Sequence, residues 1–206
     1  MKSKKNLFLC LGAFILLSGC QLDEPDSYSD LDVVYTDYIK DYDFASKGTY
    51  ARPDKIVVDV KIEDGDTTFV YMEAQYATPI LASIDENMAS LGWSRVDISA
   101  SPDVLLTPAM MKSTTVFFSY WYDWWYGGYY PPYWGWYYPP YVSISSYTTG
   151  SLLMTISDPE VQSPTGTSPA VWVAAAAGLV TWNYDVNRVT KGIDQAFAQS
   201  PYLKTN

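Results

Sequence analysis

The chain has 206 residues and a formal net charge of −10 at pH 7, and it contains two cysteines and no histidine. The absence of histidine excludes Ser-His-Asp and Cys-His catalysis and any imidazole zinc site. Because a strongly negative surface repels nucleic-acid phosphates, we expect no nucleic-acid partner.

The first twenty residues have the pattern of a bacterial lipoprotein signal peptide. Three lysines precede an apolar run over residues 7–17, which is shorter than the roughly twenty residues that cross a bilayer as a helix. The run ends in the sequence LSGC, which resembles a lipobox with Cys20 as the lipidated residue. We therefore predict that residues 1–19 are removed and that Cys20 carries lipid; the alternative is an ordinary secretory signal that contains a cysteine.

Two or three acyl chains on Cys20 would anchor the protein to a membrane permanently, since one chain by itself binds only marginally. Gln21 follows the cysteine in place of the aspartate of an inner-membrane retention signal. We therefore expect the outer membrane, with the domain on its periplasmic face or on the cell surface. Residues 20–31 are acidic and are predicted to form a tether. Residues 22–26 resemble the export tag of Bacteroidetes surface lipoproteins, although a solvated tether explains them equally well.

Residues 32–203 have the length of one domain, and their patterns predict strands and two helices. Strands are expected over residues 32–38, 55–62, 67–72, 103–123 with a bulge near Pro108, 141–157 and 170–182. Residues 55–72 form a hairpin in this scheme. Four alanines in 170–182 leave a buried helix as the alternative there.

Helices are expected over residues 78–92 and 185–199, where apolar residues recur on one face. Thr78 is the predicted N-cap of the first helix, Pro79 its first residue and Gly92 its end. Asp85 and Glu86 are expected on the solvated face of this helix. Asp185 is the predicted N-cap of the second. The expected fold class is α+β: a two-layer sandwich with a mainly antiparallel sheet, two amphipathic helices on one face and a long aromatic-tipped hairpin.

Residues 120–141, which we call the aromatic segment, contain fourteen aromatic rings in 22 positions and form the predicted hairpin tip. At about 150–250 Å² per ring, these side chains far exceed the roughly 300–600 Å² of the largest exposed apolar patch on a typical soluble protein. The rings must therefore pack on one another or on the sheet, or meet a partner. The predicted contact residues are Tyr122, Trp124, Trp125, Tyr129, Tyr133, Trp134, Trp136 and Tyr137.

A protein or a glycan fits such a surface best. Trp and Tyr are enriched at protein interfaces, and flat rings stack on sugars. A membrane interface also favours these residues but is opposed by the negative charge. We expect a non-catalytic protein without a cofactor or metal. The alternative is a carboxylate-based hydrolase acting on envelope or extracellular glycans, with Asp41 and Asp43, or Asp103 and Asp123, as its acid pair. The acidic turn at residues 63–66 lacks the spacing of a calcium loop.

Several short motifs in order resemble a family of bacterial lipoproteins defined by domain of unknown function 4136. They are Asp43-Phe44, Thr49-Tyr50, Leu91-Gly92-Trp93, Pro102-Asp103-Val104-Leu105, Thr149-Gly150-Ser151-Leu152 and Ile193-Asp194-Gln195-Ala196-Phe197. The resemblance covers about residues 31–203 and departs from the family at Lys47-Gly48. It implies an envelope-anchored domain of Bacteroidetes origin, and it implies no activity or catalytic residues.

Overall fold

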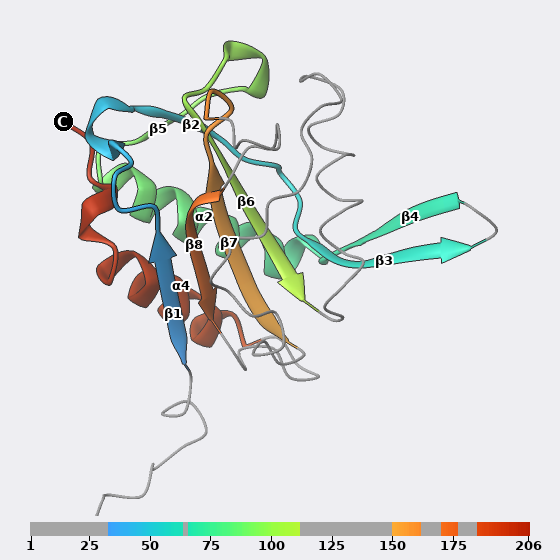
Figure 1. The fold of residues 1–206 in the computed structure, drawn as a ribbon. Helices are drawn as coiled ribbons and strands as arrows, with labels where there is room; N and C mark the ends of the chain where they lie inside the picture. Colours follow the sequence, from blue (N-terminus) through green and yellow to red (C-terminus); the bar gives the residue numbers. More distant parts are fainter. Residues whose placement is uncertain (1–32, 64–65, 112–149, 162–169, 177–184) are drawn as a thin grey trace, which may run out of the picture. The chain divides into compact units, whose positions relative to one another are not determined.

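The structure is a computed structural model that describes residues 33–63, 66–111, 150–161, 170–176 and 185–206 (Figure 1). The predicted signal peptide, the tether with Cys20 and the aromatic segment lie outside the described residues. The outer parts of the strands predicted over 103–123, 141–157 and 170–182 lie outside them as well.

The described strands form one sheet of eight, in the order β1-β8-β7-β6-β2-β5, with β3 beside β6 and β4 beside β3. The strands are β1 (Val34–Tyr38), β2 (Thr49–Ala51), β3 (Val57–Glu63), β4 (Asp66–Tyr71), β5 (Ser94–Arg95), β6 (Val104–Met111), β7 (Ser151–Ser157) and β8 (Ala170–Ala176). The β3–β4 hairpin and the strand at β8 are confirmed, so the helix alternative for the latter is wrong over Ala170–Ala176.

The described sheet is mainly antiparallel, as the sequence predicted, and three short parallel pairings make it mixed. Strands β1, β8, β7 and β6 pair antiparallel, but β2 runs parallel to both β5 and β6, and β3 runs parallel to β6. Strands β2 and β5 were not predicted because three and two residues are too short to show alternation. The bulge expected near Pro108 is wrong, because Pro108 pairs with Met154 in an unbroken register.

Within the described residues, two α-helices complete the α+β fold: α2 (Ala74–Ser90) and α4 (Val186–Ala198). Helix α2 begins four residues before the predicted N-cap, Thr78, so that Pro79 lies inside it. The earlier turn is held by packing, since Ala77 is buried on the same face as Leu81. The predicted end is confirmed: Gly92 has φ of +94°, a conformation that glycine adopts without strain.

The cap of α4 is confirmed, since Asp185 accepts hydrogen bonds from the main-chain N–H groups of Asn187 and Arg188. Helices α2 and α4 pack on each other and on the same side of the sheet (Figure 1). The core between these layers includes Leu106, Met154 and Trp172 from the sheet and Ile84 and Ile193 from the helices.

Candidate functional site

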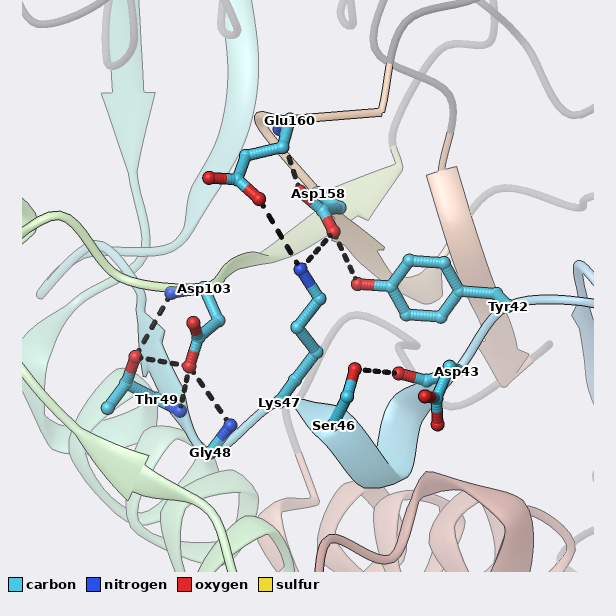
Figure 2. A network of polar contacts seen from close by, with 9 residues as sticks. All are labelled: Tyr42, Asp43, Ser46, Lys47, Gly48, Thr49, Asp103, Asp158 and Glu160. Atoms are coloured by element: carbon cyan, nitrogen blue, oxygen red, sulfur yellow. Dashed lines mark hydrogen bonds and ion pairs between the residues drawn. The ribbon is translucent and has the colours of Figure 1, made fainter.

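A buried carboxylate, Asp158, organises a polar cluster that we call the Asp158 network (Figure 2). The Tyr42 hydroxyl donates a hydrogen bond of 2.7 Å to Asp158 Oδ2, and Lys47 Nζ lies 2.9 Å from the same oxygen. The main-chain N–H of Glu160 donates to Asp158 Oδ1 at 2.7 Å. The Asp158 side chain is 1% exposed, so the network joins an ionised pair in a place that water barely reaches.

Strand topology brings these residues together. Tyr38 at the end of β1 and Ile156 near the end of β7 both pair with Trp172, on opposite sides of β8. The chain therefore leaves β1 and β7 at the same end of the sheet. Beyond β1 it makes a 3-10 turn, η2 (Phe44–Ser46), which the buried ring of Phe44 anchors. Tyr42 and Lys47 flank that turn, and both reach Asp158, which follows β7 directly.

The two side chains that donate to Asp158, Tyr42 and Lys47, stay protonated. Burial raises the pKa of Tyr42 well above its usual value, and the hydrogen bond to Asp158 and the charge of that carboxylate raise it further. Burial would lower the pKa of Lys47, but the carboxylates of Asp158 and Glu160 outweigh burial and leave the pKa raised. Neither side chain is therefore available as a base or an amine nucleophile near neutral pH.

Asp103, one of the predicted acid candidates, links two strands beside this network (Figure 2). Its Oδ2 accepts hydrogen bonds from Gly48 N at 3.0 Å, Thr49 N at 2.8 Å and the Thr49 hydroxyl at 2.7 Å. Burial would raise the pKa of Asp103, but these hydrogen bonds and the charge of Lys47 hold the pKa below its ordinary value. The carboxylate thus joins the start of β2 to the start of β6, where the two strands pair in parallel.

A second polar cluster, the Asp85 network, lies around helix α2. Asp85 Oδ1 accepts from Arg52 Nε and from the Tyr50 hydroxyl, both at 2.7 Å, and Arg52 Nη2 donates to Asp85 Oδ2. Arg95 Nη1 lies 3.5 Å from the same Oδ2 and its Nη2 contacts Asp54. Burial would raise the pKa of Asp85, but Arg52, Tyr50 and Arg95 together lower it.

The sequence placed Asp85 on a solvated helix face, and that prediction is wrong. Asp85 is half-buried and forms a two-pronged ion pair with Arg52, which extends from the end of β2. Its neighbour Glu86 is exposed, as predicted. A helical wheel could not find the difference, because the partner comes from a strand that the sequence did not reveal.

Of the remaining predicted site residues, some lie on the surface and the others lie outside the described residues. Asp41 and Asp43 are exposed, whereas Asp123, Cys20 and the eight aromatic contact residues lie outside the described residues. In the part of the chain that the structure describes, no three Asp or Glu side chains gather as metal ligands. No helix among the described ranges is long and apolar enough to cross a bilayer.

The sequence patterns did not identify Tyr42, Lys47 or Asp158 as site residues. One signal was present: Asp158 directly follows β7, a strand in which six of seven residues are buried. A carboxylate at the end of a buried strand needs a cation or several donors nearby. The identity of that cation could not be read from the sequence, because Lys47 is far from Asp158 along the chain.

The fold is thus an α+β domain whose described polar networks join strands, turns and a helix to one another. The model of the family defined by domain of unknown function DUF4136 matches residues 34–202. The chain therefore belongs to the DUF4136 family, as the motifs predicted.

Among solved structures, the chain is similar to a DUF4136 family protein from Bacteroides thetaiotaomicron, with 33% identity and a TM-score of 0.62. That match covers 84% of this chain and 97% of the other. A PDZ domain protein from Parabacteroides distasonis matches with 16% identity and a TM-score of 0.44, over 84% of this chain and 37% of the other. Comparison with curated proteins finds no match.

Proposed function

We propose that the protein is a lipid-anchored outer-membrane protein that acts by binding and not by catalysis, with the aromatic segment as its contact surface. The observation that carries this proposal is that three of the described carboxylates are hydrogen-bonded within the fold. Asp158, Asp103 and Asp85 each accept several hydrogen bonds from groups that belong to the fold. Groups committed in this way hold the scaffold together, so we assign contact with a partner to the aromatic segment.

Membrane attachment through Cys20 rests on the LSGC motif and on the acidic tether that follows it. The similarity to a Bacteroides protein supports an origin in a bacterium with an outer membrane. On this proposal the domain begins at β1, about a dozen residues beyond the lipid. A random coil of that length spans roughly 20 Å, so a lipid on Cys20 would keep the domain close to the membrane surface.

The two cysteines of the chain provide a matched test of the anchor. Cells that express the wild-type chain or the Cys10→Ala variant are expected to incorporate labelled palmitate into the protein and to retain it in the membrane fraction. Cys20→Ala is expected to lose the label and to accumulate as the uncleaved precursor. Equal labelling of Cys20→Ala and wild type, or a wild-type protein that washes into the soluble fraction, would contradict the anchor.

The contact surface is tested with the four predicted tryptophans. A variant with Trp124, Trp125, Trp134 and Trp136 changed to alanine is expected to lose binding in glycan arrays or in pull-downs from envelope extracts. It should keep the melting temperature of the wild type. Trp182→Ala, which removes an indole outside the aromatic segment, is the control. If the quadruple variant fails to fold, the rings are part of the core and the proposed surface is wrong.

A further inference from the structure

The exposed apolar side chains of the described residues gather on one strand. Val33, Tyr35 and Ile39 are 64%, 41% and 39% exposed, and they are the large hydrophobic residues of the described part that remain exposed. They alternate along β1 and its ends, so their side chains lie on one face of the strand. The even-numbered Val34 and Tyr38 pack instead against the core beneath the helices.

Strand β1 is also an edge of the described sheet, where β8 is its neighbour on one side. The N–H of Ile39 donates to the carbonyl oxygen of Val171 at 2.9 Å. Main-chain groups alternate in direction along a strand, so the odd-numbered residues of β1 face β8 and the even-numbered ones face outward. The N–H of Tyr38 donates a hydrogen bond of 2.8 Å to Oδ1 of the adjacent Asp37. The outward groups of Val34 and Thr36 are a template for another strand.

We propose that a second copy of this chain adds its β1 to this edge, antiparallel, around a two-fold axis at Thr36. The residues around Thr36 are self-complementary in this register. Val33 lies opposite Ile39 of the second copy, so the two outer residues of the exposed apolar row contact each other across the interface. Tyr35 lies opposite Asp37 of the second copy, a hydroxyl against a carboxylate. Each contact occurs twice, as a two-fold interface requires.

The neighbouring pairing registers place side chains of unfavourable charge or polarity opposite each other. A two-fold axis at Asp37 would place that carboxylate opposite its own copy, and like charges directly opposite destabilise a strand pair. An axis at Tyr35 would place Asp37 opposite the apolar Val33. The axis at Thr36 avoids both arrangements and lets the outward N–H and carbonyl of Thr36 bond to the same groups of the second copy.

The local hydrogen bonds of the single chain can be exchanged on pairing. The Tyr35 hydroxyl lies 3.3 Å from Asp37 Oδ2 of its own chain, an exposed and long contact. In the pair, that hydroxyl donates to Asp37 of the second copy. The N–H of Tyr38 passes from the Asp37 carboxylate to the carbonyl of Val34 of the second copy. Because the single chain already satisfies these groups, association is reversible and depends on concentration.

The register is tested by disulfide trapping in the full-length chain. Val33→Cys and Ile39→Cys chains are expected to cross-link under mild oxidation when they are mixed, because directly opposite Cβ atoms lie about 4.5–5.5 Å apart. Neither variant should cross-link by itself, since identical residues of the two copies are separated by about six strand positions, or roughly 20 Å. The wild-type chain measures the background from Cys10 and Cys20.

A charge test uses Tyr35, whose side chain faces away from the core. Tyr35→Glu sets like charges opposite Asp37 twice and should weaken dimerisation about tenfold. Tyr35→Lys, a control of similar size and opposite charge, should keep it, and adding Asp37→Lys to Tyr35→Glu should restore it. Sedimentation equilibrium in density-matched detergent measures the constants. Monomeric wild type at all concentrations, equal effects of the two Tyr35 variants, or cross-linking in either cysteine variant by itself would overturn the proposal.

Discussion

The two polar networks pair the same kinds of side chain, but the buried partner is the anion in one network and the cation in the other. Each has a carboxylate that accepts a tyrosine hydroxyl at 2.7 Å and pairs with a cationic side chain. In the Asp158 network the anion is 1% exposed and Lys47 is 18% exposed. In the Asp85 network the cation is the hidden partner, since Arg52 is 5% exposed and Asp85 is 30% exposed. The partner that water cannot reach sets the cost of breaking each pair.

The largest effect is expected from Lys47→Met, which removes the Lys47 ammonium group from the buried Asp158 carboxylate. Breaking a buried pair in this way costs about 3–5 kcal/mol of unfolding free energy, and urea denaturation measures it. Glu160→Gln is the matched control: the Glu160 side chain is 87% exposed and lies 3.8 Å from Lys47, so its loss should cost under about 0.5 kcal/mol. Equal effects of the two variants would refute the role assigned to burial.

Asp85→Asn is expected to cost about 2–3 kcal/mol, because the buried Arg52 guanidinium loses its charge-assisted hydrogen bonds. The cost is smaller than for Lys47→Met since Arg52 keeps its 2.8 Å hydrogen bond to the Pro53 carbonyl and lies 3.8 Å from Asp54. The same denaturation measurement decides the order. A larger loss for Asp85→Asn would mean that the arginine network matters more than the buried carboxylate.

The two tyrosines permit a comparison that removes one hydroxyl at a time. Tyr42→Phe should cost about 1.5–3 kcal/mol, since the hydroxyl donates to a charged acceptor that water barely reaches. Tyr50→Phe should cost about 1 kcal/mol less, because water can replace the hydroxyl at the partly exposed Asp85. Melting temperatures of the two variants, with circular dichroism to verify the fold, test this difference. Equal losses would remove the distinction between the networks.

The smallest effect is the dependence of stability on acid pH. The pKa of Asp103 in the folded chain lies below its ordinary value of 3.8, so ionised Asp103 stabilises the fold above that pH. The contribution is lost as the pH falls from about 3.8 through the folded-state pKa. Asp103→Asn, which cannot titrate, should show a shallower fall in stability below this pH than wild type. Parallel pH curves for the two proteins would contradict it.

Local patterns predicted the elements that depend on near neighbours. The Asp185 cap, the end of α2 at Gly92 and the β3–β4 hairpin are set by residues a few positions apart. The start of α2 was predicted too late because Thr78 and Pro79 are good starting residues in isolation. Burial of Ala77 outweighs that preference.

Residues that meet from distant parts of the chain could not be predicted in the same way. Tyr42 and Asp158 are 116 positions apart, and Arg52 and Asp85 are 33 apart. Each pair depends on which strands are neighbours, and the parallel pairing of the three-residue β2 leaves no periodic signal. The family was nevertheless recognisable, since its motifs keep their order along the chain whatever the pairing.

Hydrophobic spacing, caps and turn residues were therefore enough to predict an α+β domain with two amphipathic helices. The LSGC motif near the N-terminus predicts lipidation of Cys20. Folding in three dimensions decided which acids are buried and paired, which strands run parallel and which edge of the sheet shows apolar side chains. The reason is the separation of the contacting residues along the chain. A helix or hairpin is stabilised by contacts within a few residues, whereas these ion pairs and the order of strands in the sheet depend on chain topology.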